Sequence, residues 1–91
     1  MEKDIEKRCC ELAEKRGWYY RKFVSPGRRG AFDRIFIRKG VVLFVEFKQP
    51  GKTLDPLQDV EFWQLKTHDA RTYVCDNLKS FVSILDANSN P

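Results

Sequence analysis

The sequence Asp33-Arg-Ile-Phe-Ile-Arg-Lys-Gly-Val-Val-Leu-Phe-Val-Glu-Phe-Lys48 contains two β-strands joined by a tight turn. Asp33–Arg38 alternates in polarity, with Ile35 and Ile37 on one face. Val41–Lys48 is a mostly apolar run, typical of a strand that is covered on both faces. Lys39-Gly40 between them predicts a two-residue hairpin turn.

This turn fixes which residues of the two strands face each other. Arg38 pairs with Val41, and continuing the register places Asp33 opposite Glu46. Directly opposite side chains lie about 5 Å apart at Cβ, so the two carboxylates repel unless they share a proton or bind a cation. Lys48 follows Glu46 by two positions and therefore projects from the same face.

Before the hairpin, the pattern predicts a helix, a strand and a loop. Ile5, Cys9 and Leu12 recur at helical spacing within residues 2–16. The aromatic and β-branched residues 18–24 predict a strand. The sequence Ser-Pro-Gly-Arg-Arg-Gly at 25–30 predicts a loop.

After the hairpin, a helix, a strand and a helix are expected. Asp55 and Pro56 form an N-cap and first helical position for a helix that ends near residue 69. Arg71–Asp76 predicts the last strand, and Asn77 caps a short helix. The apolar stripe expected for that helix is Leu78, Phe81, Val82 and Leu85.

The helix expected at 55–69 is apolar on two sides. Leu57, Val60 and Trp63 point one way, whereas Phe62 and Leu65 point another. A helix of this kind has two faces to cover, which predicts a core face and a second face for a subunit or DNA.

Composition indicates a single small folded domain of 91 residues with a hydrophobic fraction of 42%. We expect the domain to span residues 1–85, and residues 86–91 to form a disordered tail. The net charge of +4 suits a polyanion such as nucleic acid, although many folded proteins are mildly basic.

The cysteine and histidine content argues against a zinc site. Cys9, Cys10 and Cys75 include no Cys-x-x-Cys pair, and His68 is the sole histidine. An odd number of cysteines suits free thiols in a reducing compartment. No apolar run approaches the length of a membrane span, and the charged start is unlike a secretory signal. We therefore expect a cytoplasmic protein.

Asp33, Glu46 and Lys48 form the arrangement that points to chemistry. Magnesium takes one or two carboxylates and keeps several waters, and the backbone carbonyl of Phe47 can add a third oxygen. Such an ion activates water and neutralises a phosphate, while Lys48 can orient the water or stabilise the transition state. The alternative is a surface charge cluster, because Glu-x-Lys on a strand is common by chance.

Three motifs together resemble the VRR-NUC domain (virus-type replication–repair nuclease), a branch of the PD-(D/E)XK nucleases. They are Phe-Val-Ser-Pro-Gly-Arg-Arg-Gly-Ala-Phe-Asp-Arg-Ile, Val-Glu-Phe-Lys-Gln-Pro-Gly-Lys and Leu-Asp-Pro-Leu-Gln. The resemblance spans about residues 2–76. It implies an α/β fold with a mixed (α+β) sheet: a restriction-endonuclease-like αβββαβ core in a single small domain.

The resemblance also implies roles for individual residues. Asp33 and Glu46 match the metal-binding acids, Lys48 matches the catalytic lysine, Glu2 matches an acid at the start of the first helix, and Gln58 matches a glutamine after the Glu-x-Lys strand. Phe32 stands where the family usually has proline.

Some of these residues have a simpler explanation. Glu2 also suits the positive end of a helix dipole, and Glu6 competes with it as the helix acid. Gln58 stands three residues after Asp55, which is the spacing of a capping box.

Basic and aromatic residues are the candidates for DNA contact. Arg28 and Arg29, on the loop before Asp33, are expected to contact phosphates, with Arg21 and Lys52 as weaker candidates. The aromatic residues Trp18, Tyr19 and Tyr20 can stack on bases, but core or dimer packing suits them as well.

The resulting prediction is a homodimeric DNA endonuclease of the bacterial or phage-infected host cytoplasm. It uses Mg²⁺ or Mn²⁺ and acts on branched DNA such as four-way (Holliday) junctions, as the resemblance implies for small phage or bacterial members. The alternatives are a non-cleaving DNA-binding module and an accessory subunit of a replication or repair complex.

Overall fold

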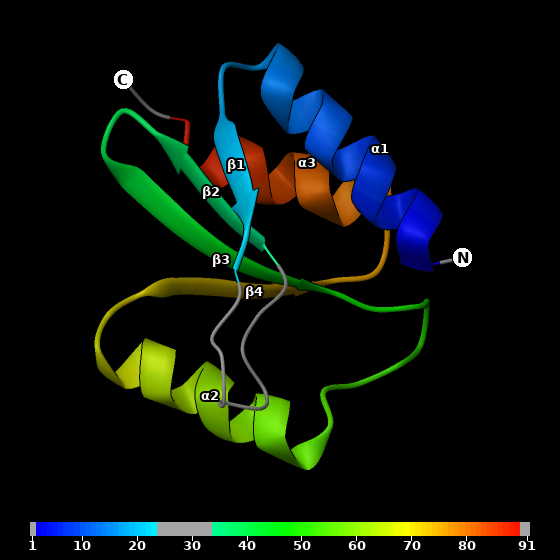
Figure 1. Ribbon diagram of the computed structural model, residues 1–91, viewed down its shortest axis with the longest axis vertical. Coiled ribbons are helices and arrows are strands. Elements are labelled where there is room, and N and C mark those ends of the chain that lie inside the picture. The colour runs from blue at the N-terminus through cyan, green and yellow to red at the C-terminus, as the bar shows by residue number, and fades with distance from the viewer. Residues whose placement is uncertain (1, 24–33, 90–91) are drawn as a thin grey trace.

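A computed structural model of the chain describes residues 2–23 and 34–89, although not the side chains of residues 2 and 3. The element order is α-β-β-β-α-β-α, as predicted (Figure 1). The helices are α1 (Glu2–Lys15), α2 (Pro56–Thr67) and α3 (Leu78–Ala87), and the strands are β1 (Tyr19–Lys22), β2 (Arg34–Arg38), β3 (Val41–Phe47) and β4 (Arg71–Cys75).

The four strands form one mixed sheet in the order β1-β2-β3-β4. β2 is antiparallel to both β1 and β3, whereas β4 is parallel to β3. A parallel neighbour requires a crossover, and α2 supplies it between β3 and β4. The predicted fold class, a mixed sheet in a single small domain, is therefore confirmed.

The hairpin between β2 and β3 has the predicted turn and register. Lys39 and Gly40 both have positive φ, 51° and 82°, as a type I′ turn requires. Arg38 pairs with Val41, and the ladder continues to Arg34 opposite Val45. The next expected pair includes Asp33, which lies outside the described residues.

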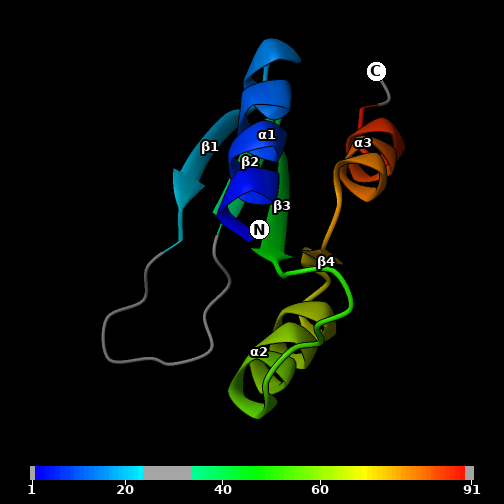
Figure 2. The ribbon, with the colours of Figure 1, turned by 90° about the vertical axis from the view of Figure 1, so that its right-hand side faces the viewer.

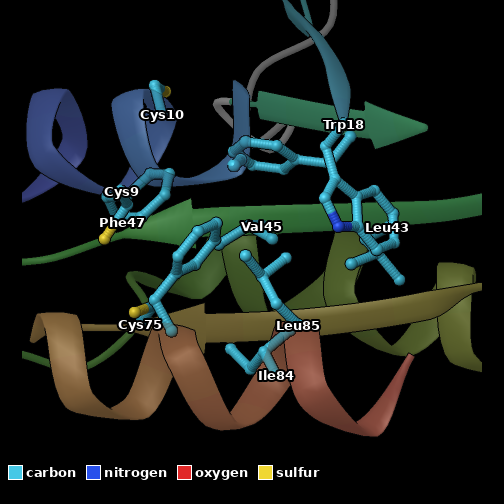
Figure 3. Packing of buried hydrophobic residues seen from close by; sticks show 12 residues of the cluster. Cys9, Cys10, Trp18, Leu43, Val45, Phe47, Cys75, Ile84 and Leu85 are labelled. Carbon is cyan, nitrogen blue, oxygen red and sulfur yellow. The ribbon is translucent and has the colours of Figure 1, made fainter. Parts of the chain in front are cut away.

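The sheet separates α2 from α1 and α3 (Figures 1 and 2). Side chains alternate along β3, so Leu43, Val45 and Phe47 enter the core beside α1 and α3. Figure 3 shows Cys9 and Cys10 of α1 in one cluster with Val45 and Phe47 of β3 and with Ile84 and Leu85 of α3. Glu46, between two core residues, faces the opposite way, towards α2.

Aromatic rings form the centre of this core. Phe36 lies 5.3 Å from Phe81 and 6.3 Å from Phe47 between ring centroids, and Phe47 lies 5.8 Å from Phe81. All three side chains are 0% exposed. Tilted and edge-on contacts at such separations add to the stabilisation that burial provides.

All three cysteines lie in the same core as free thiols, and the expectation of unpaired cysteines is met. A hydrogen bond with Cys75 and burial both raise the pKa of the Cys9 thiol. Burial raises the pKa of Cys10 to about 11. Cys75 also donates a hydrogen bond to the carbonyl of Asn77. The same hydrogen bond with Cys9 lowers the pKa of the Cys75 thiol. At neutral pH Cys9 and Cys10 remain protonated, and they fill space as small apolar groups.

Two details at the end of the chain differ from prediction. α3 buries Phe81, Ile84 and Leu85, while Leu78 is 39% exposed, because the buried face is centred about one turn later than expected. The tail predicted from residue 86 also begins too early. Asp86 and Ala87 are helical, and Asn88 is 8% exposed because its side chain bonds Tyr73 and the carbonyl of Ile84.

The helix α2 buries none of its residues. Leu57, Val60 and Trp63 are 47%, 60% and 60% exposed, whereas Phe62 and Leu65 are partly buried. The two predicted sides therefore exist, with the second set of residues facing the protein. In the described parts of the chain, no helix combines the length and apolarity that a bilayer span requires.

Replacing Gly40 by alanine tests the turn. The position has φ of 82° and no atom within 4 Å of an added Cβ, so the cost is conformational alone. We expect Gly40→Ala to lower the free energy of unfolding by about 1–2 kcal/mol, measured by urea denaturation. Lys39→Gly should instead raise the free energy of unfolding, because glycine adopts the left-handed conformation at less cost than lysine does. Equal stability of the two variants would contradict the assigned turn.

Candidate active site

Glu46 is the buried acid of the site. It is the sixth residue of β3, pairs with Val74 of β4 and is 2% exposed. A carboxylate so deeply buried is costly unless charged or hydrogen-bonding groups surround it. Two such groups approach its Oε2 atom, one from the residue that follows β3 and one from α2.

Lys48 is the cation beside this carboxylate. Its Nζ atom lies 3.7 Å from Oε2 of Glu46, and its side chain is 17% exposed. Its backbone N–H donates to the carbonyl of Cys75 at 2.9 Å, which keeps Lys48 aligned with β4 just beyond the end of β3. The predicted same-face relation of Glu46 and Lys48 is therefore present.

Gln58 is the second group. Its Nε2 donates to Oε2 of Glu46 at 2.8 Å, across the space between α2 and the sheet. The predicted capping box is also present: the backbone N–H of Gln58 donates to Oδ1 of Asp55 at 2.9 Å, and the backbone N–H of Asp55 donates to Oε1 of Gln58 at 3.2 Å. Capping and site contact thus occur together in one side chain.

The other predicted site residues are placed as follows. α1 begins at Glu2. Glu6 accepts a 2.5 Å hydrogen bond from Nε of Arg34, in a partly buried ion pair, so its carboxylate is engaged with β2. Asp33, Arg28 and Arg29 lie outside the described residues, and their roles stay predictions.

The two weaker candidates for DNA contact are both exposed. The guanidinium of Arg21 lies 4.5 Å from the ring centroid of Tyr19, on the edge strand β1, with β2 between it and β3. Lys52 belongs to the turn after β3, where its backbone N–H donates to the carbonyl of Gln49. Of the aromatic candidates, Trp18 is 2% exposed and belongs to the core, whereas Tyr19 is 53% exposed.

Carboxylate oxygen is the donor type that Mg²⁺ and Mn²⁺ prefer. Glu46 supplies one such group, and among residues 2–23 and 34–89 no cluster of three or more His, Cys, Asp or Glu residues is found. A magnesium site needs one or two protein carboxylates, with water filling the remaining positions. The donor chemistry of the described residues therefore fits a hard divalent cation.

Sequence reasoning missed the connection between Asp55 and this acid. The spacing Asp-x-x-Gln identifies a capping box, but it carries no information about what lies beyond the amide. Only the crossover from β3 through α2 brings the first turn of that helix beside Glu46.

Comparison with known proteins agrees with the fold. A solved structure of a VRR_NUC domain matches with a TM-score of 0.86 and 29% sequence identity, over 93% of this chain and 94% of that one. The architecture is therefore that of a VRR-NUC nuclease domain.

A curated relative extends the match to sequence. The protein named "Putative nuclease p44", from Acyrthosiphon pisum secondary endosymbiont phage 1, is 39% identical over 87 residues, which cover 94% of this chain and 92% of the phage protein. No family model matches the chain. On the structural and sequence similarity together, this chain belongs to the VRR-NUC family.

A double-mutant cycle tests the pair in the site independently of any activity. Lys48→Met should lower the free energy of unfolding by about 1–3 kcal/mol, because it leaves a buried carboxylate without its cation. Combined with Glu46→Gln, the cycle should give a coupling of roughly 0.5–3 kcal/mol by urea denaturation. Lys52→Met is the control and should change stability by less than about 0.5 kcal/mol. Zero coupling would show that the two charges do not interact.

Proposed function

We propose that this chain is a Mg²⁺- or Mn²⁺-dependent DNA endonuclease that hydrolyses phosphodiester bonds, and that its natural substrate is branched DNA such as a four-way junction. The observation that carries the proposal is the buried Glu46 with Lys48 at 3.7 Å and Gln58 at 2.8 Å, on a VRR-NUC fold. A domain that only binds DNA has no need for a buried acid contacted by a lysine and an oriented amide.

The residues divide the chemistry between them. In hydrolysis, water attacks phosphorus, one P–O bond breaks, and the departing oxygen acquires a proton. When bound, the divalent ion supplies a Lewis acid that activates water and neutralises phosphate charge. Glu46 would hold it, together with Asp33 and the carbonyl of Phe47. Lys48 would orient the water or stabilise the negative charge that develops on the phosphate.

DNA binding is proposed for the basic residues near the site. The chain has 17 lysines and arginines against 13 acids, which favours a polyanionic partner. Arg28 and Arg29 precede Asp33 in the sequence, and contacts from them would hold the backbone at the site. Arg21 and Lys52 would extend the contact on either side. Glu2, at the start of α1, would add an acid that reaches the ion through water.

The bacterial or phage-infected host cytoplasm is the compartment we propose. It holds the DNA substrate and keeps thiols reduced, which suits three free cysteines.

Cleavage assays test this function. The parent chain should cut a four-way junction with Mg²⁺ or Mn²⁺ and lose activity in EDTA, with weaker cutting of flap, single-stranded and linear duplex DNA. Glu46→Gln and Asp33→Ala should each reduce the rate by about 100-fold or more, because each removes a charge that the ion requires.

Asp59→Asn is the matched control, since Asp59 is an exposed acid in the first turn of α2. It should cut like the parent. Binding of the junction without cleavage in either metal would instead support a DNA-binding module or an accessory subunit. Equal cutting by the parent and Asp33→Ala would refute the site.

A homodimer is the second part of the proposal. The exposed apolar residues Leu57, Val60 and Trp63 lie on α2, a helix with no fully buried residue. A second copy of the chain would cover them, and two sites related by a two-fold axis suit a two-fold junction.

Val60→Glu tests the dimer. A carboxylate in an apolar interface is unfavourable, so the variant should sediment as a monomer at concentrations where the parent sediments as a dimer. Gln64→Glu adds the same charge at an exposed polar position of α2 and should leave the dimer intact. A parent that remains monomeric at the highest concentration tested would remove this part of the proposal.

A further inference from the structure

One amide side chain connects the start of α2 to the buried acid. Oε1 of Gln58 accepts from the backbone N–H of Asp55 at 3.2 Å, and Nε2 of the same amide donates to Glu46 at 2.8 Å. The two ends of the amide differ chemically, because one accepts hydrogen bonds and the other donates them. Which end faces Glu46 is therefore set by which end faces Asp55.

The capping box holds this amide in one orientation. Because Oε1 accepts the hydrogen bond from Asp55, the other end of the amide, Nε2, faces Glu46. Nε2 is a donor, and the Glu46 carboxylate is an acceptor. Rotation of the amide by half a turn would place a carbonyl oxygen against a buried carboxylate and an N–H₂ group against a backbone N–H. Both contacts would be repulsive, so the orientation is strongly favoured as long as the first turn of α2 is closed.

Closure of that turn depends on the side chain of Asp55. Its Oδ1 accepts from the backbone N–H of Gln58 at 2.9 Å, and this bond keeps the N-cap and the third helical residue together. α2 buries none of its own residues, so little packing of its own holds its first turn in place. Asp55 itself is exposed, whereas Glu46 is 2% exposed.

We infer that Asp55 is a positioning residue for the Glu46 carboxylate, acting through the amide of Gln58. The helix cap and the site then form a single hydrogen-bonded unit that runs from the surface to the buried acid. The role assigned to Glu46 rests on the proposed function, but the mechanical link from Asp55 to Glu46 does not.

Nuclear magnetic resonance tests the link without metal or DNA. In Asp55→Ala, the side-chain N–H₂ signals of Gln58 should move towards those of Gln64, an exposed glutamine on the same helix. Asp55→Ser, which restores a capping oxygen, should return the signals to their original positions. Asp55→Gly also removes the capping oxygen, but glycine is tolerated at N-cap positions. This variant therefore provides the test if the alanine variant does not fold.

Manganese binding to the isolated protein provides a second measure. Asp55→Ala should bind Mn²⁺ about tenfold more weakly by calorimetry, at the low end of the effect of residues that orient metal ligands. Asp55→Ser should bind within about twofold of the parent.

Asn77→Ala is the control for helix capping alone. Asn77 caps α3 by the same kind of bond, its Oδ1 accepting from the N–H of Ser80 at 2.7 Å. Asn77→Ala should lower Tm to a similar extent but leave the Gln58 signals and Mn²⁺ binding unchanged. The inference fails if Asp55→Ala lowers Tm as Asn77→Ala does and leaves the Gln58 signals and Mn²⁺ binding unchanged. If the Gln58 signals respond as expected but the parent cuts no DNA, the link stands and the proposed nuclease function fails.

Discussion

The two-residue turn at Lys39-Gly40 is the constraint on which the rest of the structure depends. Both residues adopt positive φ, so β3 returns along β2 in a single register. Because side chains alternate along a strand, that register decides which residues enter the core and which face α2. A slip of one position would turn Phe47 outwards and bury Glu46 among the aromatic rings. The register of this hairpin therefore determines both which side chains form the core and which form the candidate site.

Local patterns were sufficient to predict much of this arrangement. The hairpin, the capping box at Asp55 and the element order follow from turn chemistry and periodicity, which act over a few residues. The contact between Gln58 and Glu46 depends instead on a parallel crossover, and no local pattern encodes how a crossover helix settles on a sheet. Local patterns fail for α3 for the same reason: its buried face lies about one turn later than predicted, and the helix continues past the residue at which the tail was predicted to begin. In α3, burial is decided by α1 and β4 rather than by the helix alone. Asp33, Arg28 and Arg29 remain predictions from the sequence.

Helix α2 contributes little to the core, but it supplies a side chain to the candidate site and carries an exposed apolar surface. Its first turn carries the amide that reaches Glu46, while Leu57, Val60 and Trp63 remain exposed along its length. In a chain of 91 residues the area available for burial is limited, and a crossover helix with exposed apolar residues reduces it further. The stability of the fold therefore rests on the opposite side of the sheet, where α1, α3 and the rings of Phe36, Phe47 and Phe81 meet.

The three buried cysteines give that side of the sheet a further property. The raised pKa values of Cys9 and Cys10 make these two thiols poor nucleophiles. All three thiols are buried, so alkylating or oxidising reagents cannot approach them while the helices stay packed. Cys9 and Cys10 belong to α1 and Cys75 ends β4, so modification of any of them reports that the contact between a helix and the sheet has opened. The native cysteines thus serve as intrinsic reporters of local opening events, with no engineered label required.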